Sequence, residues 1–279
     1  MKALTDIPYA REASELLWGK EHVQQVLQEY HPRSFLVRVF HFENRYRTID
    51  ALLNDLQPAN ILELSAGFSF RGLSMAQHST VNYVDTDLPE LIDSKQQLVQ
   101  QLIIACNIQL KGSLQTKSLN VLDQNTFTDL VSQFPEGPLT IVNEGLLMYL
   151  GVEEKKKLCA IIRKLLLQRG GQWVTADIYI KKSAYGVDLE ENTDVFTERF
   201  NEFLDAHRIE DNKFDSFEAA TAFFEECGFV ISRKLEVVTG SQLSALKMLR
   251  TNGGTNGDKE QVKKRPVIRQ TWVLEPKMS

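Results

Sequence analysis

Short apolar segments alternate with helical patterns between residues 60 and 180 of the chain. An apolar run of this length, bounded by turn residues, is typical of a strand in a covered sheet. Strands that alternate with helices form a parallel sheet with helices on both faces. The predicted strands in this part are NILELS, VNYVD, QTKSLNV, LTIVNE and QWVTADIYI. The chain is therefore expected to have a doubly wound α/β fold.

Two further strand patterns, FVISRKLEVV and RQTWVLEP, bring the predicted sheet to seven strands. We expect no helix between them, so they should form a hairpin at the sheet edge with the last strand antiparallel. The intervening TNGGTNGDKEQVKKRP is rich in Gly, Asn and Lys, which indicates a mobile loop. Before the sheet, amphipathic helices are expected at 11–30 and 34–56, ended by Pro32 and Pro58.

No change of composition marks a second domain in the 279 residues. We expect a single domain made of four parts. These are an N-terminal helical cap (1–58), a cofactor-binding core (59–180), a helical insertion that acts as a substrate lid (181–228) and a C-terminal hairpin (229–279).

Composition and charge exclude several classes of protein. The net charge of −5 disfavours a general electrostatic grip on nucleic acid. No segment approaches the ~20 apolar residues of a membrane span, and the N-terminus lacks a signal peptide, so we expect a cytoplasmic protein. Cys106, Cys159 and Cys227 have no paired spacing, which predicts neither a disulfide framework nor a metal site.

The loop after the first strand, SAGFSF, is the first candidate for a ligand site. Gly67 permits a tight turn and close approach of the backbone to a ligand. A dinucleotide fold places three glycines here to make room for pyrophosphate, but this chain has Ser65 and Ser69 at the other two positions. A nucleoside ligand without phosphates, such as S-adenosylmethionine, fits better. An ordinary strand-to-helix turn is the alternative.

Acidic residues follow two of the predicted strands. Asp87 lies 87 − 67 = 20 residues beyond Gly67, where nucleoside-binding sheets place an acid that accepts the ribose hydroxyls. Asp85 competes for this role, and Asp87 could instead cap the helix that starts at Pro89. Glu144 directly follows an apolar strand, so it needs a partner such as a cofactor amine or an arginine unless it is exposed.

Four segments together resemble the leucine carboxyl methyltransferase family, which includes bacterial polyketide-type O-methyltransferases. They are NRYRTIDALL, ELSAGFSFR, VDTDLPELIDSK and NEGLLMYL, and the resemblance covers residues 40–180. It implies a class I methyltransferase, Rossmann-like, that uses S-adenosylmethionine and releases S-adenosylhomocysteine.

The resemblance also implies roles for individual residues. Ser65, Ala66 and Gly67 correspond to the loop against the methionine part of the cofactor, and Asp87, followed by Leu88, to the ribose acid. Asn120 and Val121 match the pair beside the adenine. Glu144, followed by Gly145, matches the acid facing the methionine amine. Arg45, or alternatively Arg47, matches the arginine that pairs with the methionine carboxylate. Candidate substrate residues are Arg71, Tyr149 and Tyr185; Arg71 could instead be a surface charge, and Tyr149 a packing residue.

The expected reaction is methyl transfer to a carboxylate or hydroxyl oxygen, with no residue assigned as a base. A small-molecule acceptor is favoured, and a protein C-terminus is the alternative; the protein is expected to be a monomer or a homodimer. Ser65, Ser69 and Asn120 depart from the family pattern and keep open a cofactor-binding protein with little catalysis. A nucleotide-dependent oxidoreductase is the other alternative.

Overall fold

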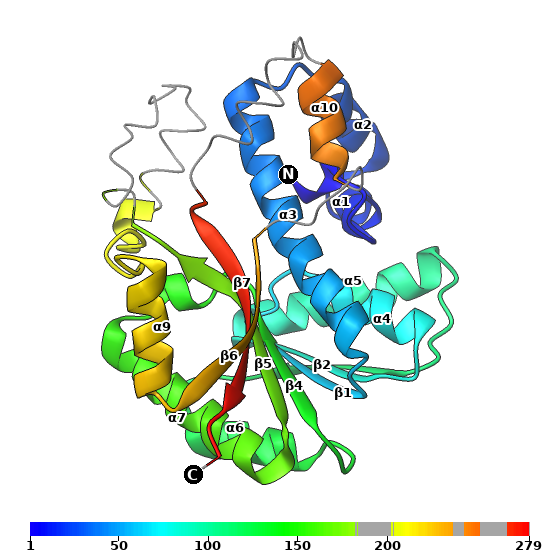
Figure 1. The fold of residues 1–279 in the computed structure, drawn as a ribbon. Helices are drawn as coiled ribbons and strands as arrows, with labels where there is room; N and C mark the ends of the chain where they lie inside the picture. The colour runs from blue at the N-terminus through cyan, green and yellow to red at the C-terminus, as the bar shows by residue number, and fades with distance from the viewer. Residues whose placement is uncertain (182, 184–201, 203, 237–242, 252–266, 279) are drawn as a thin grey trace.

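The computed structural model of the chain contains a seven-stranded sheet in the order β3-β2-β1-β4-β5-β7-β6 (Figure 1). It describes all residues except 182, 184–201, 203, 237–242, 252–266 and 279. Only β7 runs antiparallel to its neighbours. The predicted mostly parallel sheet with an antiparallel last strand is therefore confirmed. The strands are β1 (Asn60–Leu64), β2 (Asn82–Asp87), β3 (Ser113–Ser118), β4 (Leu139–Asn143), β5 (Gly171–Tyr179), β6 (Phe229–Leu235) and β7 (Arg269–Pro276).

Helices cover both faces of the sheet, as the alternation of strands and helices predicts. One face packs against α3 (Arg33–Leu56), α4 (Arg71–His78) and α5 (Pro89–Ala105). The other packs against α6 (Gln124–Ser132), α7 (Val152–Arg169) and α9 (Phe217–Glu226). The carboxyl ends of β1, β2 and β4 meet at one edge, which is where ligands bind in sheets of this type.

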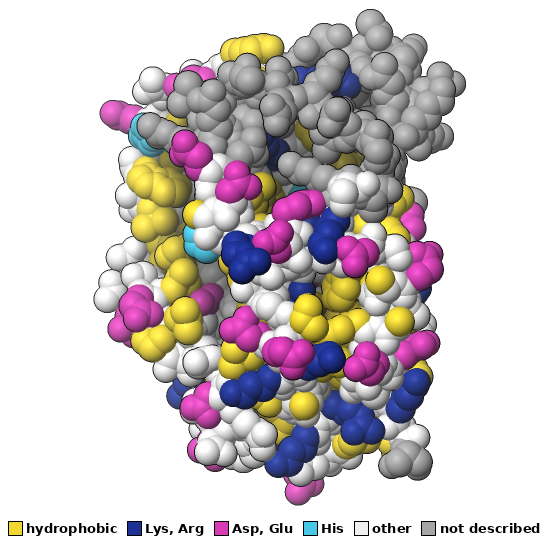
Figure 2. Space-filling model, turned by 90° about the vertical axis from the view of Figure 1, so that its left-hand side faces the viewer, with side chains coloured by type: hydrophobic (Ala, Val, Ile, Leu, Met, Phe, Trp, Pro, Cys, Tyr) yellow, Lys and Arg dark blue, Asp and Glu magenta, His cyan; other side chains and the backbone are white. Residues whose placement is uncertain are grey.

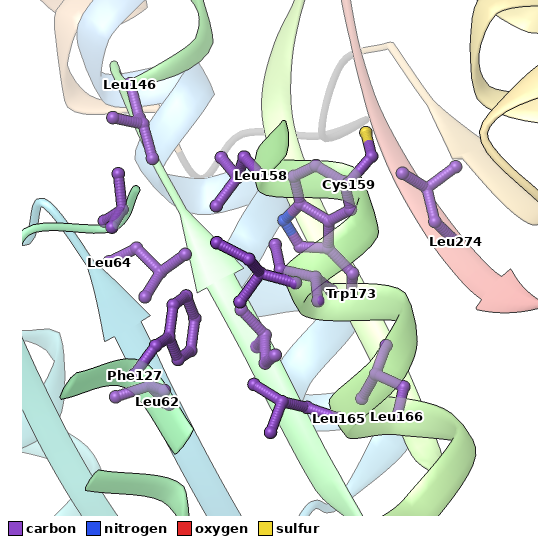
Figure 3. Close-up of a cluster of buried hydrophobic side chains, with 14 of the residues drawn as sticks. Leu62, Leu64, Phe127, Leu146, Leu158, Cys159, Leu165, Leu166, Trp173 and Leu274 are labelled. Carbon is purple, nitrogen blue, oxygen red and sulfur yellow. The ribbon is translucent and has the colours of Figure 1, made fainter. Parts of the chain in front are cut away.

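The core on the α7 face is centred on Trp173 of β5 (Figure 3). Its ring meets Phe224 and Phe229 edge-on at centroid distances of 5.6 and 5.7 Å. The indole nitrogen donates to Asn143 Oδ1 at 2.7 Å, so its polar group is satisfied although the residue is fully buried. Full burial of each large apolar side chain contributes about 1.5–3 kcal/mol, so this cluster anchors β4 and β5 rigidly beneath the site.

The N-terminal helical cap differs from the expectation in one respect. The helix expected over 11–30 is two helices, α1 (Ala10–Trp18) and α2 (Lys20–Gln28). Gly19 separates them with a φ of +84°, a conformation that the helix cannot continue through. A short 3₁₀ turn, η1 (Lys2–Leu4), precedes them.

The third strand ends earlier than its sequence pattern predicts. β3 closes at Ser118, so Asn120 and Val121 lie in the following loop. Asn120 Oδ1 accepts a hydrogen bond from the backbone N–H of Leu122 at 3.0 Å. This local turn competes with continuation of the strand.

The connection between β6 and β7 contains a helix where we expected none. α10 (Ser244–Thr251) packs against α3 and joins α1 and α2 above the sheet (Figure 1). The carboxylate of Glu43, on α3, accepts from Ser244 N at 2.9 Å, Ser244 Oγ at 2.6 Å and Ala245 N at 2.8 Å. A buried acid thus caps the helix start. Thr251, the first residue of the predicted mobile loop, ends α10, and the rest of that segment (252–266) lies outside the described residues.

β3 and β6 are the two edge strands of the sheet. Lys117 on β3, and Arg233 and Lys234 on β6, are exposed. The last strand in sequence, β7, is therefore internal, because it inserts between β5 and β6.

Among the described residues, none of the helices is both long and apolar enough to cross a membrane.

Candidate functional site

The loop between β1 and α4 is tied to the end of β2. Gly67 N donates to Asp87 Oδ2 at 2.8 Å, and Ala66 N donates to the carbonyl of Thr86 at 2.8 Å. Gly67 has a φ of +49°, and nothing lies within 4 Å of the position a Cβ would take, so its backbone faces open space. Ser65 has the same φ although it carries a side chain. Both residues therefore adopt a left-handed backbone conformation, and the loop makes a tight turn at Gly67.

Asp87 rather than Asp85 is the acid available at the end of β2. The other oxygen of Asp87, Oδ1, accepts from Leu88 N at 2.8 Å, and each oxygen retains a further lone pair for a ligand hydroxyl. Asp85 is fully buried and lies 2.8 Å from Lys95 Nζ, so it is not open to a ligand. Burial raises the pKa of Asp85 to about 6, with Lys95 opposing the rise.

Exposed apolar side chains flank Asp87 and the loop. Leu88 is 53% exposed and Phe68 is 42% exposed. Asn120, predicted to lie beside an adenine, is exposed, and Val121 is buried. Large apolar groups at a strand edge that also carries polar groups are typical of a nucleoside site, in which they contact the flat faces of the base.

Glu144, at the end of β4, is held between two arginines. Arg45 Nε lies 3.1 Å from one carboxylate oxygen, and Arg71 Nη2 lies 2.9 Å from the other. Burial alone would raise the pKa of Glu144, but the charges of Lys2, Arg45 and Arg71 outweigh it and hold the pKa well below its usual range. The acid is therefore ionised.

Arg71 joins the site to the surrounding elements. Its guanidinium contacts Asp50 at 2.9 Å, Glu63 and Glu144, and lies 4.0 Å above the ring of Tyr46. Glu63 also accepts from Tyr83 Oη at 2.5 Å. The side chain of Arg71 is 1% exposed, so the surface-charge interpretation of this residue is wrong.

The structure distinguishes the two candidate arginines on α3. Arg45 reaches Glu144 and donates from Nη1 to Tyr179 Oη at 3.2 Å. Arg47 instead donates to the carbonyl of Asp6 at 2.6 Å and contacts Asp50, away from Glu144. Gly145 has a φ of +81°, and a Cβ there would lie 3.3 Å from Arg45 Nη2, so the guanidinium uses the space that this glycine leaves.

Asp177 is a site residue that sequence reasoning missed. It accepts from Asn143 Nδ2 at 2.6 Å and from the backbone N–H groups of Gly145, Leu146 and Leu147 at 2.7, 2.6 and 3.1 Å. These four bonds fix the loop that carries Glu144. The signal was present in QWVTADIYI, since a lone acid within an apolar strand is expensive to bury without donors.

Lys2 is a second residue that the sequence did not indicate. Burial lowers the pKa of Lys2, and the charge of Glu144 opposes that shift. Its Nζ lies 5.5 Å from the centroid of the Tyr46 ring. η1 therefore brings Lys2 close enough for its charge to lower the pKa of Glu144, although the two residues are far apart in the sequence.

On the side of β5, Tyr179 and His41 form a hydrogen-bonded pair at 2.9 Å. Arg45 also donates to Tyr179 Oη, and the tautomer of His41 sets which member of the His41–Tyr179 pair is the donor. Burial, with Arg269 and Arg45 nearby, lowers the pKa of His41 to about 3, which keeps the ring neutral.

Tyr149 is 42% exposed and packs edge-on against the ring of His207. Tyr185 lies outside the described residues.

A separate cavity of about 550 Å³ lies between α3 and α4. Its walls run from Ala59 and Val81, just before β1 and β2, to Asp50 and Arg71 of the network around Glu144. The face bearing α7 and α9 shows Lys and Arg interspersed with Asp and Glu (Figure 2). Within the described residues, no group of three or more His, Cys, Asp or Glu side chains is arranged to hold a metal ion.

Residues 6–163 match the family model for leucine carboxyl methyltransferase. The chain belongs to this family. No curated protein matches it. Family membership and the strand order together identify the sheet as that of a class I methyltransferase, as the resemblance implied.

Solved structures similar to this member of the leucine carboxyl methyltransferase family have low sequence identity to it. One is magnesium protoporphyrin IX methyltransferase (ChlM) from Synechocystis PCC 6803 with bound SAH, at 10% identity, 97% coverage of this chain, 100% of that chain and a TM-score of 0.48. Another is a possible exported protein from Bordetella parapertussis, at 16% identity and a TM-score of 0.50. The match covers 92% of this chain and 73% of that chain. LepI in complex with SAM matches at 9% identity and a TM-score of 0.44, over 78% of this chain but only 43% of LepI. At these identities the similarity shows the fold alone.

Proposed function

We propose that this methyltransferase transfers a methyl group from S-adenosylmethionine to a carboxylate oxygen of a small molecule. The carboxyl edge of the sheet offers one partner for each part of the cofactor. Asp87 accepts hydroxyl donors, Leu88 and Phe68 present apolar surface, and the Glu144–Arg45 pair matches the ammonium and carboxylate of a methionine. S-adenosylmethionine supplies an activated methyl group on a sulfonium.

The chain's own residues orient the donor. Asp177 fixes the loop of Glu144 by four hydrogen bonds, and Gly67 anchors Asp87. A site preorganised in this way reduces the cost of aligning acceptor oxygen and methyl group.

The observation that carries the choice of a carboxylate acceptor is that three potential bases near the ends of β4 and β5, Asp177, Glu144 and His41, are already occupied. The oxygens of Asp177 accept four donors, and Glu144 is paired with two arginines and has a depressed pKa. His41 is neutral with a pKa of about 3, so it is a weak proton acceptor. A hydroxyl acceptor needs a base, whereas a carboxylate is already ionised at neutral pH.

In the proposed reaction, a lone pair of the carboxylate oxygen forms the O–CH₃ bond. The S–CH₃ bond breaks, and its electron pair stays on sulfur as the neutral thioether of S-adenosylhomocysteine. The product is a methyl ester, and no proton moves.

Cofactor binding can be tested by thermal unfolding with S-adenosylmethionine, S-adenosylhomocysteine and NAD, each titrated separately. A ligand at 100 times its Kd adds about 2.7 kcal/mol to the stability of the folded state. We expect both S-adenosyl ligands to raise the unfolding midpoint of the wild type and of Asp129→Asn, an exposed control on α6, and to have little effect on Asp87→Asn.

A rise with NAD alone would identify an oxidoreductase and contradict the proposal. Binding of S-adenosylmethionine without methyl transfer to any carboxylic acid, alcohol or phenol would favour a cofactor-binding protein with little catalysis. Transfer to hydroxyl compounds alone would refute the carboxylate assignment.

A further inference from the structure

Arg269 differs from the other buried arginines of the described residues. Arg45, Arg71 and Arg269 are 9%, 1% and 4% exposed. Arg71 contacts three carboxylates and Arg45 contacts one. Among the residues that the structure describes, no carboxylate forms an ion pair with Arg269. A buried guanidinium without a counter-charge is costly, so a fold retains one only where something else compensates.

The hydrogen bonds of Arg269 account for only part of its donor capacity. Nη1 donates to Thr271 Oγ1 at 2.7 Å and to the carbonyl of Ala176 at 3.4 Å. A guanidinium has five N–H donors in a flat fork. Within the described part of the chain, Nε and Nη2 have no hydrogen-bond partner. These two nitrogens can donate two parallel hydrogen bonds to the oxygens of one carboxylate.

The position of Arg269 places this cation next to the Arg45–Glu144 pair of the candidate site. Arg269 begins β7 and pairs with Tyr179 at the carboxyl end of β5. Its charge lowers the pKa of His41, which bonds to Tyr179, and Tyr179 in turn bonds to Arg45 beside Glu144. The four side chains come from α3, β5 and β7 and lie on the same face of the sheet as α3.

Together these observations point to one role. We propose that Arg269 binds the carboxylate of the methyl acceptor and thereby selects anionic acceptors over neutral ones. The inference rests on the proposed methyltransferase function. Arg269 holds the carboxylate oxygen that is not methylated, which directs the other oxygen at the methyl group. Burial lowers the pKa of Arg269, and the charges of Glu144 and Asp177 oppose this shift without overcoming it.

Three variants test this assignment. Arg269→Met removes the charge but keeps an apolar side chain of similar length, and Arg269→Lys keeps the charge without the fork. Arg163→Met is the matched control, because Arg163 also donates to backbone carbonyls, those of Gly228 and Lys277, but lies on α7 away from the site. The acceptor probes are acetate, hexanoate, benzoate and a peptide with a free C-terminal carboxylate, each compared with its neutral carboxamide.

Methyl transfer from radiolabelled S-adenosylmethionine and thermal unfolding with S-adenosylhomocysteine are measured in parallel. We expect the wild type and Arg163→Met to methylate at least one acid and no amide. In Arg269→Met the KM for that acid should rise at least about tenfold, the loss of one charge-assisted hydrogen bond or more, and in Arg269→Lys by less. The response to S-adenosylhomocysteine should be unchanged in all four proteins. The unfolding midpoint of Arg269→Met should equal or exceed that of the wild type, whereas a structural arginine would lower it.

Each other outcome has a definite meaning. An unchanged KM in Arg269→Met, or a wild type that binds S-adenosylhomocysteine but methylates none of the acids, overturns the role of Arg269. A wild type that does not respond to either S-adenosyl ligand overturns the proposed function, and the role of Arg269 with it.

Discussion

Ser65 holds a backbone conformation that suits glycine better. Its φ of +49° costs an L-residue about 1–2 kcal/mol. Glycine removes that strain but adds about 0.5–1 kcal/mol of unfolded-state entropy. We expect Ser65→Gly to raise the free energy of unfolding by about 0.5 kcal/mol, which chemical denaturation can measure.

The neighbouring Gly67 provides the opposite control at the same φ. Gly67→Ala should lower the free energy of unfolding by about 1 kcal/mol, although a Cβ would meet nothing within 4 Å. If both variants move stability in the same direction, backbone strain in this loop is not the cause.

His41 gives the protein a specific dependence on pH. Its folded pKa of about 3 lies below the ordinary value of 6.5, so the unfolded state takes up a proton first as the pH falls. The contribution of neutral His41 to the free energy of unfolding is therefore complete above pH 6.5, and it is lost progressively as the pH falls toward 3. The loss amounts to about 2 kcal/mol at pH 5.

His41→Gln keeps a donor and an acceptor for the bond to Tyr179 and removes the titration. Urea denaturation at pH 7.5 and pH 5 should show a smaller loss of stability in this variant than in the wild type. Equal losses in the two proteins would mean that His41 does not titrate differently in the folded and unfolded states.

At the scale of elements, α10 depends on an acid supplied by α3. Glu43 accepts three hydrogen bonds at the start of α10 and is fully buried. Glu43→Ala should lower the free energy of unfolding by about 2–4 kcal/mol, because these are hydrogen bonds to a charged group. Amide hydrogen exchange in residues 244–251 should become faster. Glu21→Ala, at an exposed position on α2, should change neither.

The elements that the sequence predicted well are those whose periodicity is decided locally. β7 was predicted residue for residue, because RQTWVLEP is apolar, rich in β-formers and buried on both faces. α10 was missed because its first turn is stabilised by Glu43, 201 residues away, and a local pattern does not reveal such a partner. For the same reason, the sequence did not assign β6 to the edge.

The candidate site divides in a similar way. The spacing of the motifs predicted that Gly67 and Asp87 lie in one site, and in the structure Gly67 N donates a hydrogen bond of 2.8 Å to Asp87 Oδ2. The roles of Arg45, Asn120 and Glu144 toward a cofactor remain predictions. Asp177 and Lys2 were not predicted, since each reaches the site only through tertiary packing.

At the scale of the whole molecule, the Arg71 network connects separate parts of the fold. Arg71 of α4 contacts acids from α3, β1 and the loop after β4, and Glu63 extends the network to β2 through Tyr83. Removing the cation would leave the buried Glu63 without a counter-charge and would take one of the two arginine partners from Asp50 and from Glu144. Arg71→Met should therefore lower the free energy of unfolding by about 3–5 kcal/mol and abolish the response to S-adenosylhomocysteine.

Arg71→Lys tests whether charge alone is sufficient. A lysine cannot contact three carboxylates through a planar fork, so we expect partial recovery of stability. Denaturation curves in urea, compared at equal slope, would measure both variants. Wild-type stability in Arg71→Met would show that the network does not hold these elements together.

The two edges of the sheet have a consequence for behaviour at high concentration. An edge strand offers unpaired backbone groups that can recruit a strand from another copy. β3 exposes Lys117, and β6 exposes Arg233 and Lys234. Bringing two such edges together would place like charges side by side and bury them. The same cations that contribute little to the stability of one molecule therefore discourage the growth of a continuous sheet across many, and they are positions to leave unaltered when the protein is engineered for crystallisation or storage.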